Sequence, residues 1–439
     1  MHSVGDSTQT AFDRYGDLMR DHEPDHPAAG ERRLTTREAA ELLGVKPETV
    51  YAYVSRGQLG SRRAPGSRGS TFDADEVRAL ARRNRRDGGT NPASAAGQEL
   101  TVRTRLTLIE NDRFSYRGVD AVELAARHTY EEVAEWLWTG ELRPDAAFSA
   151  PESSVAAARR AVDALPEHAG PADRLRVAAI AAAVTDPLRF DLSEDAVLGT
   201  ARILIPTLVA ALPPVLRDGH DQDPIAHRLW TRLSGQEPDE PTLEALDTAL
   251  GLLVDHDLAA STLAVRVAAS ARAHAYAAVS AGLGVIEGPL HGAAGGLAHR
   301  MLLEVLDLGS AGPVVAEELR AGRRIPGLGH RLYPGEDPRA RALFALLEEV
   351  PRAAPALAAA RDVQVTAARH TPLHANVDLA LAVLTVSSGM ASTAAETIFA
   401  VARTAGWIAH ALEEYGERPL RMRPSGLYAG PRPPRPLPE

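Results

Sequence analysis

The sequence contains no cysteine, which excludes disulfide bonds, thiolate nucleophiles and cysteine-bound zinc. It also has no apolar run of the length that crosses a bilayer, because the most apolar stretch, residues 203–216, is short and contains prolines. The first residues, MHSVGDSTQTAFDRYG, lack the charged segment and apolar run of a signal peptide. We therefore expect a cytoplasmic protein that does not contact a membrane.

Aromatic residues are also scarce, at 5% of the chain, and Lys46 is the only lysine. Alanine, leucine and arginine are abundant instead, and these residues favour helices over sheets. A chain of 439 residues is too long for one core of typical size. The composition therefore favours a mainly helical protein with two or three domains.

Residues 34–83 have the pattern of a small helical module. Thr35 and Glu38 have the spacing of a capping box, Gly44 permits a tight turn between two short helices, and Gly57 ends the second helix. The stretch resembles the winged helix-turn-helix of excisionase-like and MerR-like DNA-binding domains. The resemblance implies that the second helix enters the major groove and that nearby arginines contact phosphates. The candidate DNA-binding residues are Arg56, Arg62, Arg63 and Arg68. A module that only docks or drives assembly is the alternative.

Charge and composition distinguish this module from the other segments of the chain. Residues 34–90 contain eleven Arg and Lys against seven Asp and Glu, a net charge of +4, although the whole chain has a net charge of −10. A basic module is therefore followed by an acidic body. Before the module we expect a disordered arm (1–33), and after it a linker rich in Gly, Asn, Ala and Ser (84–100). A helical block (101–430) follows and opens with a hairpin at Asn111-Asp112. The chain ends in a proline-rich tail (431–439).

Several polar side chains of the helical block stand where a core would have apolar ones. They are His256 in LLVDHDLAAST, His291 in VIEGPLHGAAGG, His330 and Arg339 in GLGHRLYPGEDPR, Asp378 in HANVDLALAVL, Arg403 in IFAVARTAG and Arg423 in LRMRPSGLYAG. Taken singly, each has a simpler explanation, since Asp378 could be an N-cap and Arg403 could pair with a carboxylate. The prolines around His330 and Arg339 indicate that both residues lie outside helices.

Taken together, these motifs resemble citrate synthase over nearly the whole of the helical block. The matching elements, in chain order, are YRG (116–118), DH (255–256) followed by AST, GPLHG (288–292), GLGHRLY with DPRA, and NVD (376–378). The resemblance implies an all-α fold in which a large helical domain forms a homodimer. A small helical domain, about residues 294–390, would close over the substrates.

The resemblance also assigns roles to the polar residues. Citrate synthase condenses acetyl-CoA with oxaloacetate and then hydrolyses the thioester. By resemblance Asp378 removes a proton from the acetyl methyl group, His291 stabilises the developing enolate, and His330 polarises the oxaloacetate ketone. The residues assigned to oxaloacetate are His256, Arg339, Phe399, Arg403 and Arg423, of which Arg423 crosses the dimer interface. No bound cofactor is expected, because acetyl-CoA is a co-substrate.

Three positions depart from the family pattern. Ala294-Gly295 follows GPLHG where an Ala-Asn pair is usual, and Leu379–Ala382 follows NVD where an aromatic and a Ser-Gly pair are common. Pro334 replaces the basic residue after the histidine motif, which affects the usual contacts with coenzyme A. Arg369 is the candidate that compensates for this loss.

No metal site is expected. His370 and His374 have a spacing of four residues, but Pro372 opposes the helix that would bring them together on a metal ion.

Two further functions stay open. One is 2-methylcitrate synthase, which uses propionyl-CoA in place of acetyl-CoA and differs by a single methylene group in the substrate. The other is a DNA-binding regulator, in which residues 34–83 bind DNA and the acidic body senses oxaloacetate or an acyl-CoA. Complete catalytic residues do not exclude the regulator.

Overall fold

The computed structural model describes residues 33–43, 45–55, 59–63, 70–74, 76–78, 80, 102–216, 220, 222–288, 291–292, 294–425, 428–431 and 435. The chain divides into two compact units, Met1–Thr101 and Val102–Glu439. The predicted arm up to residue 32, the predicted linker and most of the predicted tail lie outside the described residues. Arg56 and Arg68 lie outside them too, as do the side chains of Arg62 and Arg63.

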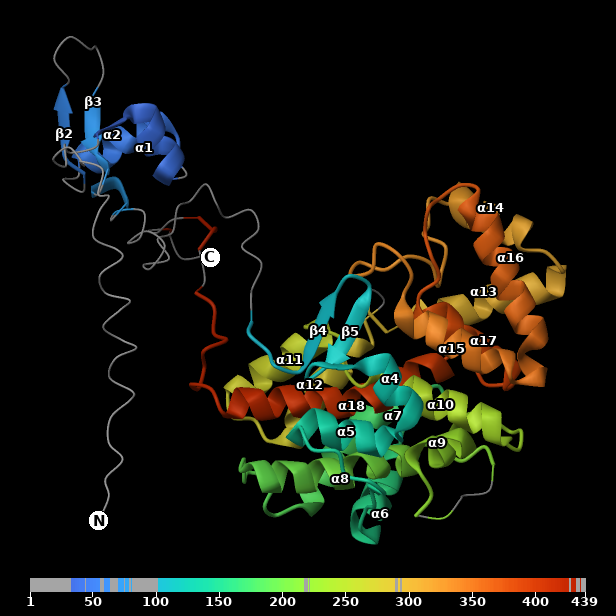
Figure 1. The fold of residues 1–439 in the computed structure, drawn as a ribbon. Helices are drawn as coiled ribbons and strands as arrows, with labels where there is room; N and C mark the ends of the chain where they lie inside the picture. The colour runs from blue at the N-terminus through green and yellow to red at the C-terminus, as the bar shows by residue number, and fades with distance from the viewer. Residues whose placement is uncertain are drawn as a thin grey trace, which may run out of the picture. The chain divides into compact units, whose positions relative to one another are not determined.

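The first unit combines two helices with a small antiparallel sheet (Figure 1). Its elements are β1 (Arg33–Thr35), α1 (Thr36–Leu43), α2 (Pro47–Ser55), β2 (Ser61–Arg63) and β3 (Ser70–Asp73), and the strand order is β1-β3-β2. The predicted capping box is present: the Thr35 N–H donates to the Glu38 carboxylate at 2.8 Å, and the Glu38 N–H donates to the Thr35 hydroxyl at 3.3 Å. Val50 and Phe72 are fully buried between the helices and the sheet. The unit is therefore a helix-turn-helix with a β-wing.

The second unit opens with the hairpin predicted at Asn111-Asp112. Strand β4 (Thr107–Glu110) pairs antiparallel with β5 (Arg113–Tyr116), which pairs with the short β6 (Val119–Asp120). Asn111 and Asp112 both have a left-handed backbone, with φ of 53° and 56°, which a two-residue hairpin turn of this kind requires.

The remainder of the second unit is helical, as expected. The α-helices, in chain order, are α4 (Ala121–Arg127), α5 (Tyr130–Thr139), α6 (Glu152–Asp163), α7 (Pro171–Thr185), α8 (Glu194–Ala211), α9 (Ile225–Leu233), α10 (Glu240–Leu253), α11 (Ala260–Ser270), α12 (Ala275–Ile286), α13 (Ala294–Leu308), α14 (Ala311–Arg320), α15 (Pro338–Glu348), α16 (Ala354–Ala368), α17 (Val377–Ser387) and α18 (Ala394–Tyr415). A single-turn 3₁₀ helix, η2 (Pro351–Ala353), precedes α16.

Helix α18 is the central element of this unit. It packs against α5, α8, α10, α11 and α12, and seventeen of its twenty-two residues are buried. Helices α13 to α17 form a second group, in which α13 packs on α17 and α14 packs on α16 (Figure 1). The buried side chains of both groups form one continuous hydrophobic core. The candidate site is carried by the segments that follow α10, α12 and α14, by the first turns of α15 and α17, and by α18.

Helix α8 includes the first part of the apolar stretch 203–216. It continues through Pro206 and ends at Ala211, before Pro213 and Pro214. Pro206 is buried, so packing on neighbouring helices offsets the loss of one helical hydrogen bond. Among the described residues, no helix combines the length and apolar character that membrane crossing needs.

Candidate active site

Two loops that are distant in the sequence pair to position His330 and Asp378. Leu328 and Ala375 form an isolated antiparallel bridge. Asn376 reinforces the pairing, because its side-chain amide donates to the Gly329 carbonyl at 2.8 Å. The Asn376 side chain also caps α17 by accepting from the Asp378 N–H at 3.0 Å. Asn376 is thus the N-cap, so capping does not explain Asp378.

Glycine is required in the first of these loops. Gly327 and Gly329 have φ of 77° and 81°, in the left-handed region that other residues rarely adopt. A Cβ atom on Gly327 would lie 2.7 Å from the Cβ of Leu379, so a larger residue would push the loop away from α17. The two glycines therefore let the chain turn tightly just before His330.

Three rings form the centre of the site. His256 lies next to His330, with ring centroids 5.1 Å apart, and Tyr333 lies 4.9 Å from the His330 ring. The Tyr333 hydroxyl is 2.7 Å from Nε2 of His256. Nδ1 of His330 accepts the Leu332 N–H at 3.1 Å, so in the neutral ring the proton is on Nε2.

Both histidines are neutral at pH 7. Burial and the Arg339 charge lower the pKa of His330 to about 4. Burial, Arg339 and Arg403 hold the pKa of His256 well below its usual value. A neutral His330 can donate its Nε2 proton in a hydrogen bond to an oxygen of a bound molecule.

Arg339 is buried beside these rings, where it can meet an anion. Its guanidinium pairs with Asp337 through two hydrogen bonds of 3.0 and 2.8 Å and lies 5.7 Å from the Tyr333 ring centroid. Asp337 also accepts the Val377 N–H at 3.1 Å, which ties α15 to α17. The expectation that Arg339 lies outside a helix is wrong: Pro338 occupies the first position of α15, where proline is tolerated, and Asp337 is the N-cap.

Arg403 reaches the site from the middle of α18 and is 1% exposed. Its Nε donates to the Leu253 carbonyl at 2.9 Å, and its guanidinium lies 4.6 Å from the Phe399 ring centroid. The helix approaches this turn closely at Gly406, where a Cβ atom would lie 2.0 Å from the Val254 carbonyl oxygen. Close packing at a glycine therefore brings Arg403 next to the turn that carries His256.

His291 lies at the other side of Phe399, with ring centroids 6.1 Å apart. Its Nε2 is 2.7 Å from the Ser261 hydroxyl, which also accepts the Trp407 indole N–H at 3.3 Å. Burial and the Arg403 charge lower the pKa of His291, so this ring is also neutral at pH 7. Glycine is required at the next residue, Gly292, because a Cβ atom there would clash with the Ile286 carbonyl oxygen.

Asp378 supplies the carboxyl group of the site. It is partly buried in the first turn of α17, near Gly295. Burial and the Asp337 charge raise the pKa of Asp378 to about 6, and Arg339 opposes this rise. The carboxyl group is therefore mostly ionised at pH 7, yet basic enough to accept a proton from carbon.

The structure thus brings together seven of the predicted residues: His256, His291, His330, Arg339, Asp378, Phe399 and Arg403. Two others lie elsewhere on the surface. Arg423 is exposed after the end of α18, and Arg369 is exposed at the end of α16. Chemically, the buried arginines can hold an anion while neutral imidazoles donate hydrogen bonds and Asp378 removes a nearby proton.

Sequence reasoning missed three partners of these residues. Ser261 contacts His291, Tyr333 contacts both central histidines, and Asp337 fixes Arg339. Each lies inside a motif that the sequence analysis quoted: Ser261 in AST, Tyr333 in GHRLY and Asp337 in the DPRA motif. The motif letters were therefore the available signal, although they did not show which residues contact one another.

Comparison with known proteins decides the family. Residues 97–425 match the family model "Citrate synthase, C-terminal domain". The chain belongs to the citrate synthase family. It is 32% identical to citrate synthase of Haloferax volcanii over 357 residues, which covers 75% of this chain and 94% of that protein. It is 28% identical to 2-methylcitrate synthase of Mycobacterium tuberculosis over 343 residues, covering 73% and 86%.

Solved structures agree with this family. Citrate synthase from Pyrobaculum aerophilum superimposes with a TM-score of 0.64 at 25% identity, covering 77% of this chain and 92% of that one. A complex of Thermoplasma acidophilum citrate synthase with carboxymethyl coenzyme A and oxaloacetate shares the fold, with a TM-score of 0.63 at 22% identity, covering 79% and 97%. The chain is thus a citrate-synthase-type enzyme, in the class of condensing acyltransferases.

A second family model covers the first unit. Residues 33–85 match "Helix-turn-helix domain". The citrate synthase family member described here therefore carries an additional N-terminal helix-turn-helix, as the sequence predicted.

Proposed function

We propose that this enzyme is a citrate synthase, which condenses acetyl-CoA with oxaloacetate and hydrolyses citryl-CoA to citrate and coenzyme A. The observation that carries the proposal is the convergence of Asp378, with its raised pKa, on neutral His330 and two buried arginines. Several of the most similar relatives bear the name citrate synthase, and the Thermoplasma protein binds oxaloacetate with a coenzyme A derivative. No bound cofactor enters this proposal.

Carbon–carbon bond formation begins at the acetyl methyl group. The Asp378 carboxylate accepts one methyl proton, and the electron pair moves toward the thioester oxygen, where His291 donates a hydrogen bond. The enolate carbon then attacks the ketone carbon of oxaloacetate. His330 polarises that ketone and gives its Nε2 proton to the new alkoxide.

The oxaloacetate carboxylates are bound by the arginines. Arg339 and Arg403 present buried guanidinium groups, and His256 adds a hydrogen bond. Phe399 packs between Arg403 and His291 and so lies beside the reacting groups. Water then cleaves the thioester, which releases citrate and the free thiol of coenzyme A.

The choice of acyl group is the main alternative within this family. Acetyl-CoA and propionyl-CoA differ by one methylene group, a difference worth only about 1–3 kcal/mol in a pocket. The test is thiol release on mixing the protein with oxaloacetate and each acyl-CoA. A higher kcat/KM for acetyl-CoA supports citrate synthase, and the reverse ratio assigns 2-methylcitrate synthase.

Coenzyme A binding is assigned to Arg369. Its side chain is exposed at the end of α16, in the group of helices α13 to α17 that we propose closes over the substrates. Arg369→Met should raise the KM for acetyl-CoA several-fold and leave the KM for oxaloacetate unchanged. An unchanged KM for acetyl-CoA would remove Arg369 from the site.

The active form is a homodimer in which Arg423 of each chain serves the partner's site. Four apolar side chains at the end of α7 and in the following turn are unusually exposed: Ile180 at 58%, Val184 at 73%, Leu188 at 73% and Phe190 at 67%. A face of this kind is typical of a surface that another chain covers. We assign it to the second copy.

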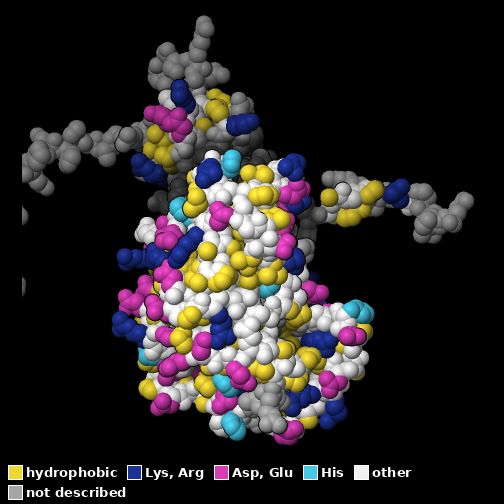
Figure 2. All heavy atoms as spheres, turned by 90° about the vertical axis from the view of Figure 1, so that its right-hand side faces the viewer, with side chains coloured by type: hydrophobic (Ala, Val, Ile, Leu, Met, Phe, Trp, Pro, Cys, Tyr) yellow, Lys and Arg dark blue, Asp and Glu magenta, His cyan; other side chains and the backbone are white. Residues whose placement is uncertain are grey.

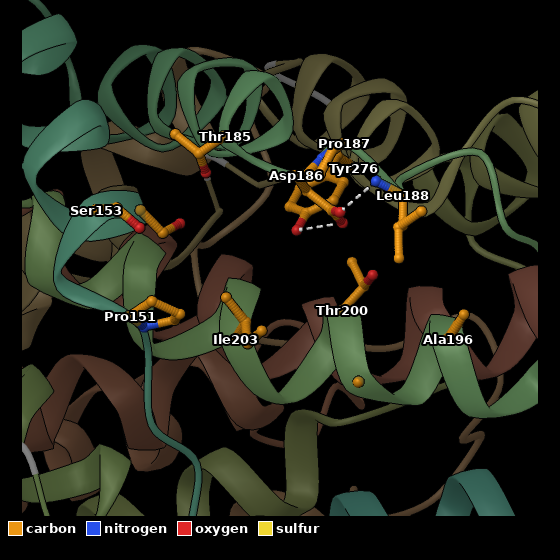
Figure 3. A pocket seen from close by; sticks show the side chains of 12 residues that line it. Pro151, Ser153, Thr185, Asp186, Pro187, Leu188, Ala196, Thr200, Ile203 and Tyr276 are labelled. Carbon is orange, nitrogen blue, oxygen red and sulfur yellow. Dashed lines mark hydrogen bonds between the residues drawn. The ribbon is translucent and has the colours of Figure 1, made fainter.

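A hollow beside this face fits the same assignment. It has a volume of about 300 Å³ and is lined by α6, α7, α8 and α12. Thr200 and Ile203 of α8 form one wall, opposite Asp186, Pro187 and Tyr276 (Figure 3). The Tyr276 hydroxyl donates to Asp186 at 3.2 Å, so these two polar groups are paired, and we assign the hollow to an apolar side chain of the partner.

Subunit mixing tests the role of Arg423. The Arg423→Ala chain and the Asp378→Ala chain are co-expressed with different tags, and the mixed dimer is purified. One of its two sites then has both groups, so activity should return to about half of the wild-type value. A mixed dimer as inactive as its parents would contradict the exchange of Arg423.

DNA binding is the second candidate function, and the helix-turn-helix unit favours it. On the face of the molecule in Figure 2, the basic and acidic side chains of the described residues are interspersed, which does not favour phosphate binding there. The basic segment 34–90 is the better candidate, with Arg56, Arg62, Arg63 and Arg68 as its phosphate contacts.

A gel shift with genomic fragments, with and without oxaloacetate and acyl-CoA, tests this function. Removal of residues 1–95 is the control. A shift that requires residues 1–95 and responds to either metabolite supports a metabolite-sensing regulator. A protein that binds no fragment would leave assembly as the role of the unit.

A further inference from the structure

The segment after α18 is fixed to its own chain before it reaches Arg423. The Leu420 N–H donates to the Ser270 carbonyl at 2.7 Å, and the Met422 N–H donates to the Ser270 hydroxyl at 3.3 Å. Leu420 has a left-handed backbone, with φ of 58°. The segment 420–423 is therefore a defined turn on the end of α11.

Arg421 joins this turn to a buried charge. Its guanidinium donates to the Glu414 carboxylate at 2.6 Å, and Glu414 is fully buried in α18. The Arg421 side chain is 27% exposed, so this bond lies at the edge of the core. A charged hydrogen bond to a buried carboxylate is stronger than one between exposed groups.

The buried side of Glu414 leads to the floor of the site. Arg266 lies 3.3 Å from Glu414 and donates to Nδ1 of His410 at 2.8 Å. Because Nδ1 accepts that proton, His410 donates through Nε2 to Asp255 at 3.1 Å. Asp255 directly precedes His256, so a chain of polar side chains connects the turn 420–423 with the site.

The Arg423 side chain makes none of the contacts that join the residues of its own site. Its side chain is exposed, and among the described residues it has no hydrogen-bond or ion-pair partner. Only its main chain is held, through the Arg423 N–H to the Leu420 carbonyl at 3.1 Å. The turn and the Arg421–Glu414 bond therefore hold the main chain from which the Arg423 side chain extends.

We infer that Arg421 is a positioning residue, which aims Arg423 at the active site of the partner subunit. The inference rests on the proposed exchange of Arg423 between subunits and adds what fixes its direction. Arg421 contacts no substrate in this account. Its loss should not unfold the protein, because Glu414 keeps its contact with Arg266 and the Arg421 side chain is not fully buried.

Steady-state kinetics of Arg421→Met separate positioning from general damage. The KM for oxaloacetate should rise about tenfold, the effect of one misplaced charged contact, while the KM for acetyl-CoA stays within about twofold. Arg421→Lys should recover part of the loss. Arg418→Met is the matched control, because Arg418 is exposed in the same segment, and it should behave as wild type.

A change only in kcat, together with a lower Tm, would show that Arg421 has a merely structural role. An unchanged KM for oxaloacetate would overturn the inference as well. If the wild-type protein releases no thiol with either acyl-CoA, the proposed function fails. This outcome can be told apart from the two results for Arg421→Met, because it is seen in the wild-type protein.

Subunit mixing decides in which site Arg421 acts. The Arg421→Met chain is paired with the Asp378→Ala chain, so that the single complete site receives its Arg423 from a chain with an intact Arg421. This mixed dimer should have the wild-type KM for oxaloacetate and about half of the wild-type kcat. A KM that stays raised would place the effect of Arg421 within its own site and contradict the inference.

Discussion

At the scale of single residues, the site shifts the pKa of Asp378 and the pKa of His330 in opposite directions. Asp378 has a pKa of about 6, whereas His330 has a pKa of about 4. Both shifts have burial as their largest cause, and burial disfavours the charged form of each group. The carboxyl group is thereby made a stronger base and the imidazole is kept neutral.

This separation predicts the pH profile. Because Asp378 must be ionised to accept a proton, kcat should rise with pH through about 6 and then level off. His330 should cause no further change in kcat above about pH 5. The measurement is kcat for thiol release between pH 5 and 9 at saturating substrates. Full kcat already at pH 5, with a fall only near pH 4, would contradict the assignment of Asp378 as the base.

Residue identity was predictable from motifs, but residue partners were not. His291, His330 and Asp378 each stand in a short pattern that resembles the family. Ser261 and Tyr333 required the structure, because their contacts join residues 30 and 77 positions apart. A hydrogen bond between distant segments depends on packing, which no local pattern of residues contains.

At the scale of elements, the close approach of α18 to the turn 253–256 positions Arg403. Gly406→Ala should therefore destabilise the protein by about 1–3 kcal/mol, since its Cβ would clash with main chain and not with a flexible side chain. It should also raise the KM for oxaloacetate, because α18 carries Arg403.

The chain offers a matched control in α12. A Cβ atom on Gly284 would have the Arg176 side chain as its nearest neighbour, at 3.8 Å, so Gly284→Ala should raise the free energy of unfolding by about 0.5–1 kcal/mol through helix propensity. The free energy of unfolding in urea is the measurement for both variants. Equal effects at the two glycines would show that the approach of α18 is not tight.

Elements with strong local signals were predicted, and those that depend on context were not. The hairpin at Asn111-Asp112 and the capping box at Thr35 follow from turn and cap chemistry. The start of α15 at Pro338 is not evident from the sequence, because proline indicates non-helical structure at most positions but is tolerated at the first position of a helix. Helix α8 continues through Pro206 for a different reason, the surrounding core.

At the scale of the whole molecule, a carboxyl group far from catalysis should control stability with pH. Burial and the Glu131 charge raise the pKa of Asp247 to about 7, and Asp247 accepts the Tyr130 N–H at 3.3 Å. An unfolded aspartate has a pKa of about 3.9, so the folded state binds a proton that the unfolded chain has lost. The contribution of Asp247 to the free energy of unfolding therefore falls as pH rises from about 4 to about 7.

Asp247→Asn should remove this dependence. The free energy of unfolding of the variant should exceed that of the wild type by about 1–3 kcal/mol at pH 8 and by much less at pH 5. The reason is that the asparagine still accepts the Tyr130 N–H and carries no charge. Urea unfolding at the two pH values is the measurement, and Glu244→Gln on the exposed side of α10 is the control. A gain that does not grow with pH would contradict the raised pKa.

Whole-molecule organisation was predicted in part. The helical body and the N-terminal helix-turn-helix follow from composition and motifs, and the family models match both. The continuous core, the chain of polar contacts from Asp255 to Arg421 and the exposed face of α7 depend on how helices far apart in the sequence pack. The homodimer and the cytoplasmic location stay predictions.

The most direct test of the central claim is thiol release by the purified protein with oxaloacetate and acetyl-CoA, compared with Asp378→Ala. The absence of cysteine means that no protein thiol contributes to the signal. We predict release by the wild type and a loss of about 10²-fold or more in the folded variant. Equal release by both proteins, or none by a folded wild-type dimer with acetyl-CoA or propionyl-CoA, would contradict the account.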